Sequence, residues 1–135
     1  MLKKEKKQNT LKFNKLSKKT IVIGASDKPD RYAYKAIVSL QKHNHEVIPL
    51  GIKDGIINGL EIIKSKPQIK DVDTVTLYVG PQNQTDWIDY IISLQPKRVI
   101  FNPGTENIEF ENLLKNNNIE PIEACTLVML SIGNY

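Results

Sequence analysis

From residue 20 onward, the chain alternates between two patterns of hydrophobic and polar positions. Short runs of aliphatic, mostly β-branched residues are typical of strands buried in a parallel sheet, and they lie at 20–24, 46–50, 72–79, 98–101 and 119–123. Four of these runs are followed by apolar residues at helical spacing. The first predicted helix ends near 42–44, and the second begins around 82–85 and ends before Pro96. The third contains Phe110 and Leu113, and the fourth covers 125–132.

This order predicts an α/β fold, a single Rossmann-like doubly wound parallel sheet of about five strands flanked by helices. Residues 51–70 are ambiguous, because their glycines suggest turns while 60–63 fits a short strand. In such a sheet, a ligand lies beyond the carboxyl ends of the strands where the strand order reverses. Here that point falls between the strands at 20–24 and 72–79. The domain is expected to cover 19–135.

The basic character of the chain is concentrated at its beginning. The formal net charge is +4, but residues 1–19 hold eight lysines and one glutamate, a net charge of +7, which leaves −3 for residues 20–135. A nucleic-acid binder usually carries a basic stripe on its folded face. Residues 1–18 are therefore predicted to be a flexible lysine-rich leader, and no nucleic-acid partner is expected. Weak contact of this leader with RNA or anionic lipid is the alternative.

The composition is that of an ordinary soluble domain, with 40% hydrophobic and 25% charged residues. A single cysteine, Cys125, excludes an internal disulfide framework and a cysteine-rich zinc site. No run approaches the roughly 18 apolar residues of a membrane span. We therefore expect a cytoplasmic protein with no metal site and no membrane association. An exposed apolar edge would support a homodimer, although no pattern identifies one.

The junction between the first strand and the first helix is the most informative segment. The strand runs into Gly24-Ala25-Ser26, and the cations Lys28, Arg31 and Lys35 follow. In an α/β protein, this arrangement directs backbone N–H groups and the positive end of a helix dipole toward a phosphate. The segment therefore predicts a phosphorylated ligand.

Each of these residues also has a purely structural interpretation. Gly24 permits a tight turn, and Ser26 is a suitable helix-end hydroxyl. Asp30 is an equally good N-cap for a helix that starts near Arg31. Arg31 is a solvated surface charge in this interpretation, and Tyr32 merely covers the crevice.

Elimination narrows the class of ligand. The loop has one glycine instead of the three of the dinucleotide motif, and no acidic residue follows the strand at 46–50. The P-loop sequence of nucleotide hydrolases is also absent. These absences disfavour NAD. An NADP-dependent reductase with Lys53 at the 2′-phosphate stays open as an alternative, as does an interaction module that uses the basic leader.

The segment 24–31, together with Val47-Ile48-Pro49-Leu50 one helix later, resembles the small stand-alone CoA-binding proteins. Their fold is similar to the CoA-binding domain of the succinyl-CoA synthetase alpha subunit. The resemblance extends from about Lys19 to the C-terminus and includes Tyr78 and Val79 in a later strand.

The resemblance implies binding of coenzyme A or an acyl-CoA, with the diphosphate against the first loop and the adenosine near the end of the second strand. The family looks like a binding module, so we predict no catalytic residue. The predicted ligand contacts come from four loops. They are Gly24, Ala25, Ser26, Lys28, Arg31, Tyr32, Lys35, Pro49, Tyr78, Val79, Asn102, Pro103 and Gly104.

Cys125 has two interpretations. A free cysteine is usually a small buried hydrophobic residue. Cys125 also lies at the predicted start of the last helix, where a thiolate is stabilised. If a pantetheine arm reaches it, Cys125 would form a mixed disulfide with the thiol of coenzyme A.

Overall fold

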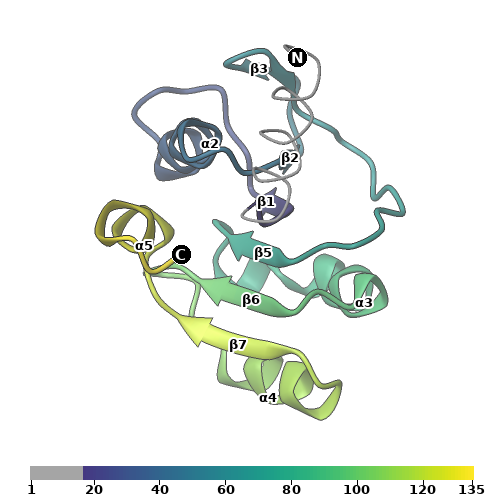
Figure 1. The fold of residues 1–135 in the computed structure, drawn as a ribbon. Coiled ribbons are helices and arrows are strands. Elements are labelled where there is room, and N and C mark those ends of the chain that lie inside the picture. The colour runs from purple at the N-terminus through teal and green to yellow at the C-terminus, as the bar shows by residue number, and fades with distance from the viewer. Residues whose placement is uncertain (1–16) are drawn as a thin grey trace, which may run out of the picture.

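The computed structural model describes residues 17–135, and in this part a central sheet carries helices on both faces (Figure 1). The sheet has five strands in the order β2-β1-β5-β6-β7, and every neighbouring pair is parallel. The predicted doubly wound α/β sheet is confirmed. The strands are β1 (Thr20–Ile23), β2 (Val47–Leu50), β5 (Thr74–Leu77), β6 (Arg98–Phe101) and β7 (Glu120–Glu123).

The helices form two layers that cover opposite faces of this sheet (Figure 1). One layer contains α2 (Tyr32–Lys42) and α5 (Thr126–Ile132), whose apolar residues share one core cluster. The other layer contains α3 (Thr85–Leu94) and α4 (Ile108–Asn116), which pack on a second cluster, and the short 3-10 helix η1 (Pro81–Asn83) precedes α3. Because β1 lies between β2 and β5, the strand order reverses between β1 and β5. A crevice for a ligand is expected at that point.

The strand predicted at 72–79 is shorter in the structure. Only Thr74–Leu77 pairs with β1, residue for residue with Thr20–Ile23. Beyond Ile23, the segment that follows β1 turns away from β5 at Gly24, where φ is +92°. One further hydrogen bond, from Tyr78 N–H to the Ile23 carbonyl (2.8 Å), closes the ladder. The turn in β1 therefore sets the length of β5.

The ambiguous stretch after β2 folds back as a hairpin. Its strands β3 (Ile56–Ile57) and β4 (Leu60–Glu61) are antiparallel. The two residues between them, Asn58 and Gly59, have φ of +47° and +86°, which suits an Asn-Gly hairpin turn. Ile63 then bridges Leu50 in parallel. The base of the hairpin is therefore held against the end of β2. Its tip reaches the last turn of α2, where Asn58 Nδ2 donates to Gln41 Oε1 at 2.9 Å.

The predicted leader falls almost entirely outside the described residues, which begin at Ser17. The first described residues contact the domain, because Lys18 N–H donates to His45 Nδ1 at 2.9 Å. The Lys18 ammonium donates to the main-chain oxygen of Tyr135 at 2.6 Å. The Tyr135 hydroxyl is in turn 2.6 Å from Thr20 Oγ1. These bonds join the start of β1 to the end of the chain.

Glu111 on α4 is a charged residue that the fold buries, with an exposed fraction of 8%. It accepts a hydrogen bond from Asn107 N–H at 3.2 Å. Burial and a hydrogen bond with Glu123 raise the pKa of Glu111 above its ordinary value. The carboxylate form is therefore disfavoured in the folded protein.

This raised pKa predicts a pH dependence of stability. A carboxyl whose folded-state pKa exceeds its unfolded value of about 4.3 stabilises the fold below that pH, and this contribution is lost as pH rises through the folded-state pKa. We expect Glu111→Gln to be more stable than the native chain at neutral pH and to lose less stability between about pH 4 and 7. Urea unfolding across this range measures the effect. The exposed neighbour Glu109→Gln is the control, and identical slopes for Glu111→Gln and the native chain would contradict the prediction.

Candidate functional site

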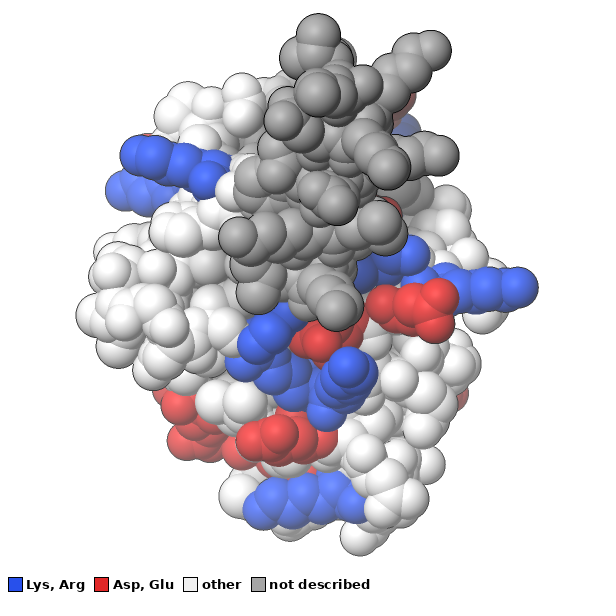
Figure 2. Space-filling model, viewed as in Figure 1, with Lys and Arg blue, Asp and Glu red and all other residues white. Residues whose placement is uncertain are grey.

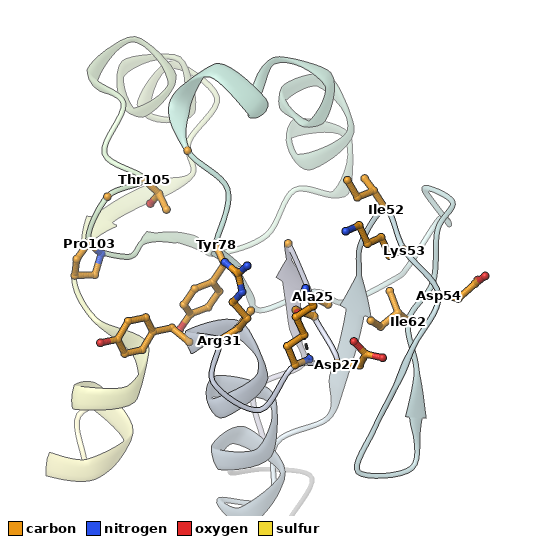
Figure 3. Close-up of a pocket in the computed structure, with 17 residues that line it drawn as sticks. Ala25, Asp27, Arg31, Ile52, Lys53, Asp54, Ile62, Tyr78, Pro103 and Thr105 are labelled. Atoms are coloured by element: carbon orange, nitrogen blue, oxygen red, sulfur yellow. Dashed lines mark hydrogen bonds between the residues drawn. The ribbon is translucent and has the colours of Figure 1, made fainter.

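The candidate site is a cavity of about 420 Å³ at the carboxyl ends of β1 and β5, which we call the first cavity (Figure 3). Its walls come from four segments: the loop after β1, residues 51–63 after β2, the loop after β5 and the loop after β6. We call residues 51–63 the hairpin region, because they include the hairpin and the residues on either side of it. This is the crevice that the strand order predicts. The lining residues are Gly24, Ala25, Ser26, Asp27, Lys28, Arg31, Tyr32, Ala33, Ile52, Lys53, Asp54, Ile62, Tyr78, Gly80, Pro103, Gly104 and Thr105.

Two glycines allow the loops at the base of the first cavity to approach one another. Gly24 adopts φ of +92°, and a Cβ there would lie 2.9 Å from the Tyr78 carbonyl oxygen. A Cβ at Gly51 would lie 2.8 Å from the Ala25 carbonyl oxygen. Any larger residue would push these loops apart, and at Gly24 it would also be strained. The loops after β1, β2 and β5 therefore meet only because both positions are glycine.

The first two amides of the β1 loop are engaged within the protein. Gly24 N–H and Ala25 N–H both donate to the Leu50 carbonyl, each at 3.0 Å. The Ser26 hydroxyl accepts from Lys28 N–H at 3.2 Å. Amides offered to a ligand would therefore come from Ser26 onward and not from the glycine itself.

The N-terminus of α2 opens on the first cavity without a cap. The alternative interpretation of Asp30 as the N-cap does not hold, since the helix starts at Tyr32 and Arg31 occupies the cap position without a side-chain cap bond. The first turn contains no acidic residue. Uncapped N–H groups and the helix dipole at this position favour an anion.

The rim of the first cavity is cationic. Lys28, Arg31 and Lys53 line it, together with the two acids Asp27 and Asp54. Asp54 is paired with Lys64 at 2.8 Å, so its charge is compensated. All three cations are exposed and therefore accessible to a ligand from solvent.

Tyr78 lies between Arg31 and Pro103 in the view of Figure 3. Its hydroxyl is buried and has no hydrogen-bond partner among the described residues. The neighbouring hydroxyls of Thr76 and Thr126 bond each other at 2.8 Å. Burial raises the pKa of Tyr78 well above its ordinary value, against a smaller opposing effect of Thr126. Tyr78 is therefore a neutral residue whose hydroxyl lies beside those of Thr76 and Thr126.

A second cavity of about 250 Å³ adjoins the first on the side of α5. None of its lining residues carries a charge, and three of them also line the first cavity. The lining residues are Tyr32, Tyr78, Asn102, Pro103, Cys125 and Leu127.

Asn102 was predicted as a ligand contact, but its side chain is engaged within the fold. It is 2% exposed. Its amide donates to Thr76 Oγ1 at 2.6 Å and to the Leu77 carbonyl at 2.8 Å. Its oxygen accepts from Thr126 N–H at 2.9 Å. Asn102 therefore joins β5, β6 and α5, and it shapes the wall of the second cavity.

Gln84, a residue that the sequence did not single out, fixes two of the site loops. Its amide donates to the Val79 carbonyl at 3.0 Å and to the Thr105 carbonyl at 2.7 Å. Its oxygen accepts from Asn107 Nδ2 at 2.9 Å. The side chain is fully buried. It therefore links the loops after β5 and β6, and no sequence motif marks such a role.

Nine of the thirteen predicted contacts line the first cavity: Gly24, Ala25, Ser26, Lys28, Arg31, Tyr32, Tyr78, Pro103 and Gly104. Asn102 lines the second cavity, and Val79 lines a neighbouring cavity of about 460 Å³ beside Trp87. Pro49 lies inside β2, where its carbonyl accepts from Ile63 N–H at 2.9 Å. The Lys35 ammonium is 5.3 Å from the centroid of the Tyr32 ring and outside the lining of the first cavity.

Seven further residues line the first cavity but are not among the predicted contacts: Asp27, Ala33, Ile52, Asp54, Ile62, Gly80 and Thr105. Lys53 also lines it and was named only for an NADP phosphate. Several of these residues belong to the hairpin region. Their signal was the position of 52–54 immediately after a parallel strand, where ligand-binding loops occur.

Three features of the described residues bear on other kinds of site. Within 17–135, no three His, Cys, Asp or Glu side chains gather as a metal site would need. No helix in this part of the chain is long and apolar enough to cross a membrane. Figure 2 shows Lys and Arg interspersed with Asp and Glu on the visible part of one face. That pattern differs from the continuous basic stripe of a nucleic-acid binder.

The family model of the CoA binding domain matches residues 18–131. A solved structure of an uncharacterized protein shares 55% identity with a TM-score of 0.87, and the match covers 88% of this chain and 98% of that chain. No curated protein matches the sequence.

Two archaeal structures share the fold at lower identity. A hypothetical protein from Pyrococcus horikoshii OT3 is 24% identical with a TM-score of 0.78, over 93% of this chain and 89% of that chain. A conserved hypothetical protein from Pyrococcus furiosus is 26% identical with a TM-score of 0.73, over 82% of this chain and 97% of that chain. The match to the family model spans almost all of the described residues, and it agrees with the cavity at the reversal point of the sheet. This chain is accordingly a member of the CoA-binding domain family.

Proposed function

We propose that this protein binds coenzyme A or an acyl-CoA in the first cavity, with the diphosphate at the N-terminus of α2. The observation that carries this proposal is the open helix end, which has neither a side-chain cap nor an acidic residue in its first turn and faces a cationic rim. A diphosphate there would receive N–H groups from the helix and charge from Lys28 and Arg31. Membership of the CoA-binding domain family selects coenzyme A among diphosphate ligands.

The two ends of the first cavity give the ligand a direction. Ile52, Lys53 and Ile62 lie on one side of Arg31 in Figure 3, and Pro103 and Thr105 lie on the other. The apolar side chains of the hairpin region suit an adenine, and Lys53 beside them suits the 3′-phosphate of coenzyme A. The pantetheine arm would then extend toward the loop after β6.

Catalysis is not part of this proposal. The Ser26 hydroxyl accepts a hydrogen bond from Lys28 N–H, and the Thr105 hydroxyl donates to the Asn102 carbonyl at 2.8 Å. In these arrangements neither hydroxyl is paired with a general base, which an activated nucleophile would require. The lining of the first cavity contains no histidine and no cysteine.

Calorimetry with four ligands tests the proposal. We expect coenzyme A to bind more tightly than dephospho-coenzyme A, NADP and ATP. The advantage over dephospho-coenzyme A should be about fivefold, because an ion pair at an exposed rim is worth about 1 kcal/mol. Lys53→Gln should remove this difference between coenzyme A and its dephospho form. Lys42→Gln, at the other end of α2, is the matched control and should retain it.

Two results would contradict the proposal. If ATP bound as tightly as coenzyme A, the site would recognise a generic nucleotide. If NADP bound more tightly than coenzyme A, the reductase alternative would replace the proposal.

A further inference from the structure

The second cavity differs from the first in its chemistry. The first cavity has three cations on its rim, whereas the lining of the second consists of aromatic, aliphatic and neutral polar side chains. Tyr32, Tyr78 and Pro103 line both cavities. The two cavities are therefore neighbours that share a wall, at the end of the first cavity farthest from Lys53 in Figure 3.

This position suits the end of a ligand that runs through the first cavity. With the phosphates at α2 and the adenosine at the hairpin region, the opposite end of a thioester would arrive at Pro103, beside the second cavity. We propose that the second cavity holds the acyl end of a bound acyl-CoA and selects short, uncharged aliphatic acyl groups. This inference rests on the proposed function and names the ligand class of that site.

The polar groups of the second cavity explain the selection against charge. Asn102 already uses both amide hydrogens on Thr76 and Leu77, so it has no donor left for a carboxylate. The Tyr78 hydroxyl is buried, so it offers a carboxylate in the cavity no exposed donor either. A carboxylate in this pocket would lose its hydration without gaining an opposite charge.

A series of acyl-CoA ligands measures this selection. Affinity should rise from acetyl-CoA to butyryl-CoA by about threefold to fourfold for each added methylene that is buried. Butyryl-CoA and succinyl-CoA form a matched pair, because both acyl chains have four carbons and only succinyl ends in a carboxylate. We expect butyryl-CoA to bind at least tenfold more tightly. Equal or tighter binding of succinyl-CoA would overturn the inference.

Leu127→Trp fills the second cavity from α5, where Leu127 is only partly buried and the larger ring has room to adapt. This variant should weaken butyryl-CoA at least tenfold and leave adenosine 3′,5′-bisphosphate unchanged, because that fragment does not reach the cavity. Val128→Trp introduces the same ring at the next residue, which is 52% exposed, and should leave both affinities unchanged.

The two ligands separate the two possible failures. If the native chain bound neither butyryl-CoA nor adenosine 3′,5′-bisphosphate, the proposed function itself would fail. If both ligands bound to the native chain and Leu127→Trp left the affinity for butyryl-CoA unchanged, only the assignment of the second cavity would be overturned. Thermal unfolding of Leu127→Trp shows whether the variant is folded before its affinities are compared.

Cys125 offers a second measurement of where the sulfur end of the ligand lies. With coenzyme A disulfide as the added oxidant, the Cys125 thiolate would attack one sulfur, form a mixed disulfide and release coenzyme A as a thiolate. Intact-mass measurement should show one adduct that excess butyryl-CoA, which has no free thiol to reverse the exchange, suppresses and that Cys125→Ser abolishes. Absence of the adduct from a chain that binds coenzyme A would contradict this path of the pantetheine arm.

Discussion

Ser26→Asp should weaken binding of coenzyme A by about 30-fold or more while the protein stays folded. Ser26 is half-buried in the β1 loop and lines the first cavity beside Lys28 and Arg31. A carboxylate there would stand against the diphosphate, and one repulsive charge pair near a protein surface costs about 2 kcal/mol or more. Calorimetry with coenzyme A measures the loss.

Two companion variants separate charge from other effects. Ser26→Ala removes only the hydrogen bond that Ser26 Oγ accepts from Lys28 N–H, and it should change affinity less than fivefold. Ser131→Asp adds the same charge on the exposed end of α5 and should leave affinity unchanged. Full affinity in Ser26→Asp would show that the diphosphate lies elsewhere.

Asn102→Leu should lower the free energy of unfolding by about 3 to 5 kcal/mol. Leucine has a similar volume but forms none of the hydrogen bonds that Asn102 makes with Thr76, the Leu77 carbonyl and Thr126 N–H. Each buried polar group left unpaired costs about 1 to 3 kcal/mol. Urea unfolding followed by circular dichroism measures the change.

The matched control for this loss is Asn112→Leu on the exposed side of α4. The same substitution at a solvent-exposed position should change the free energy of unfolding by less than about 0.5 kcal/mol. A loss in Asn102→Leu no larger than this control would mean that Asn102 does not tie β5, β6 and α5 together.

The sheet and the place of the cavity were predictable because they depend on local pattern. The apolar run at 20–24 can only be buried in a central strand, and Gly24 marks where that strand must turn. Once four such runs alternate with helices, connection rules leave few strand orders. The reversal between β1 and β5, and with it the crevice, is a feature of the common order among them.

The finer features of the site depend on contacts between distant residues. Nothing in the local sequence shows that the Leu50 carbonyl accepts hydrogen bonds from Gly24 N–H and Ala25 N–H. These two bonds remove both amides from ligand binding. The hydrogen bonds of Asn102 and Gln84 likewise form only after three or four segments have come together. For the same reason, the sequence alone did not show that the side chain of Asn102 is tied to the framework, in addition to lining the second cavity.

The shared acceptor at Leu50 has a consequence for the cost of binding. Because Gly24 and Ala25 both donate to it, the start of the β1 loop already has its shape before any ligand arrives. Gly51, the residue after Leu50, packs against the Ala25 carbonyl, so the loop after β2 supports the β1 loop from its other side. A ligand would then lose little free energy to ordering this loop, and more of its contact energy would appear as affinity.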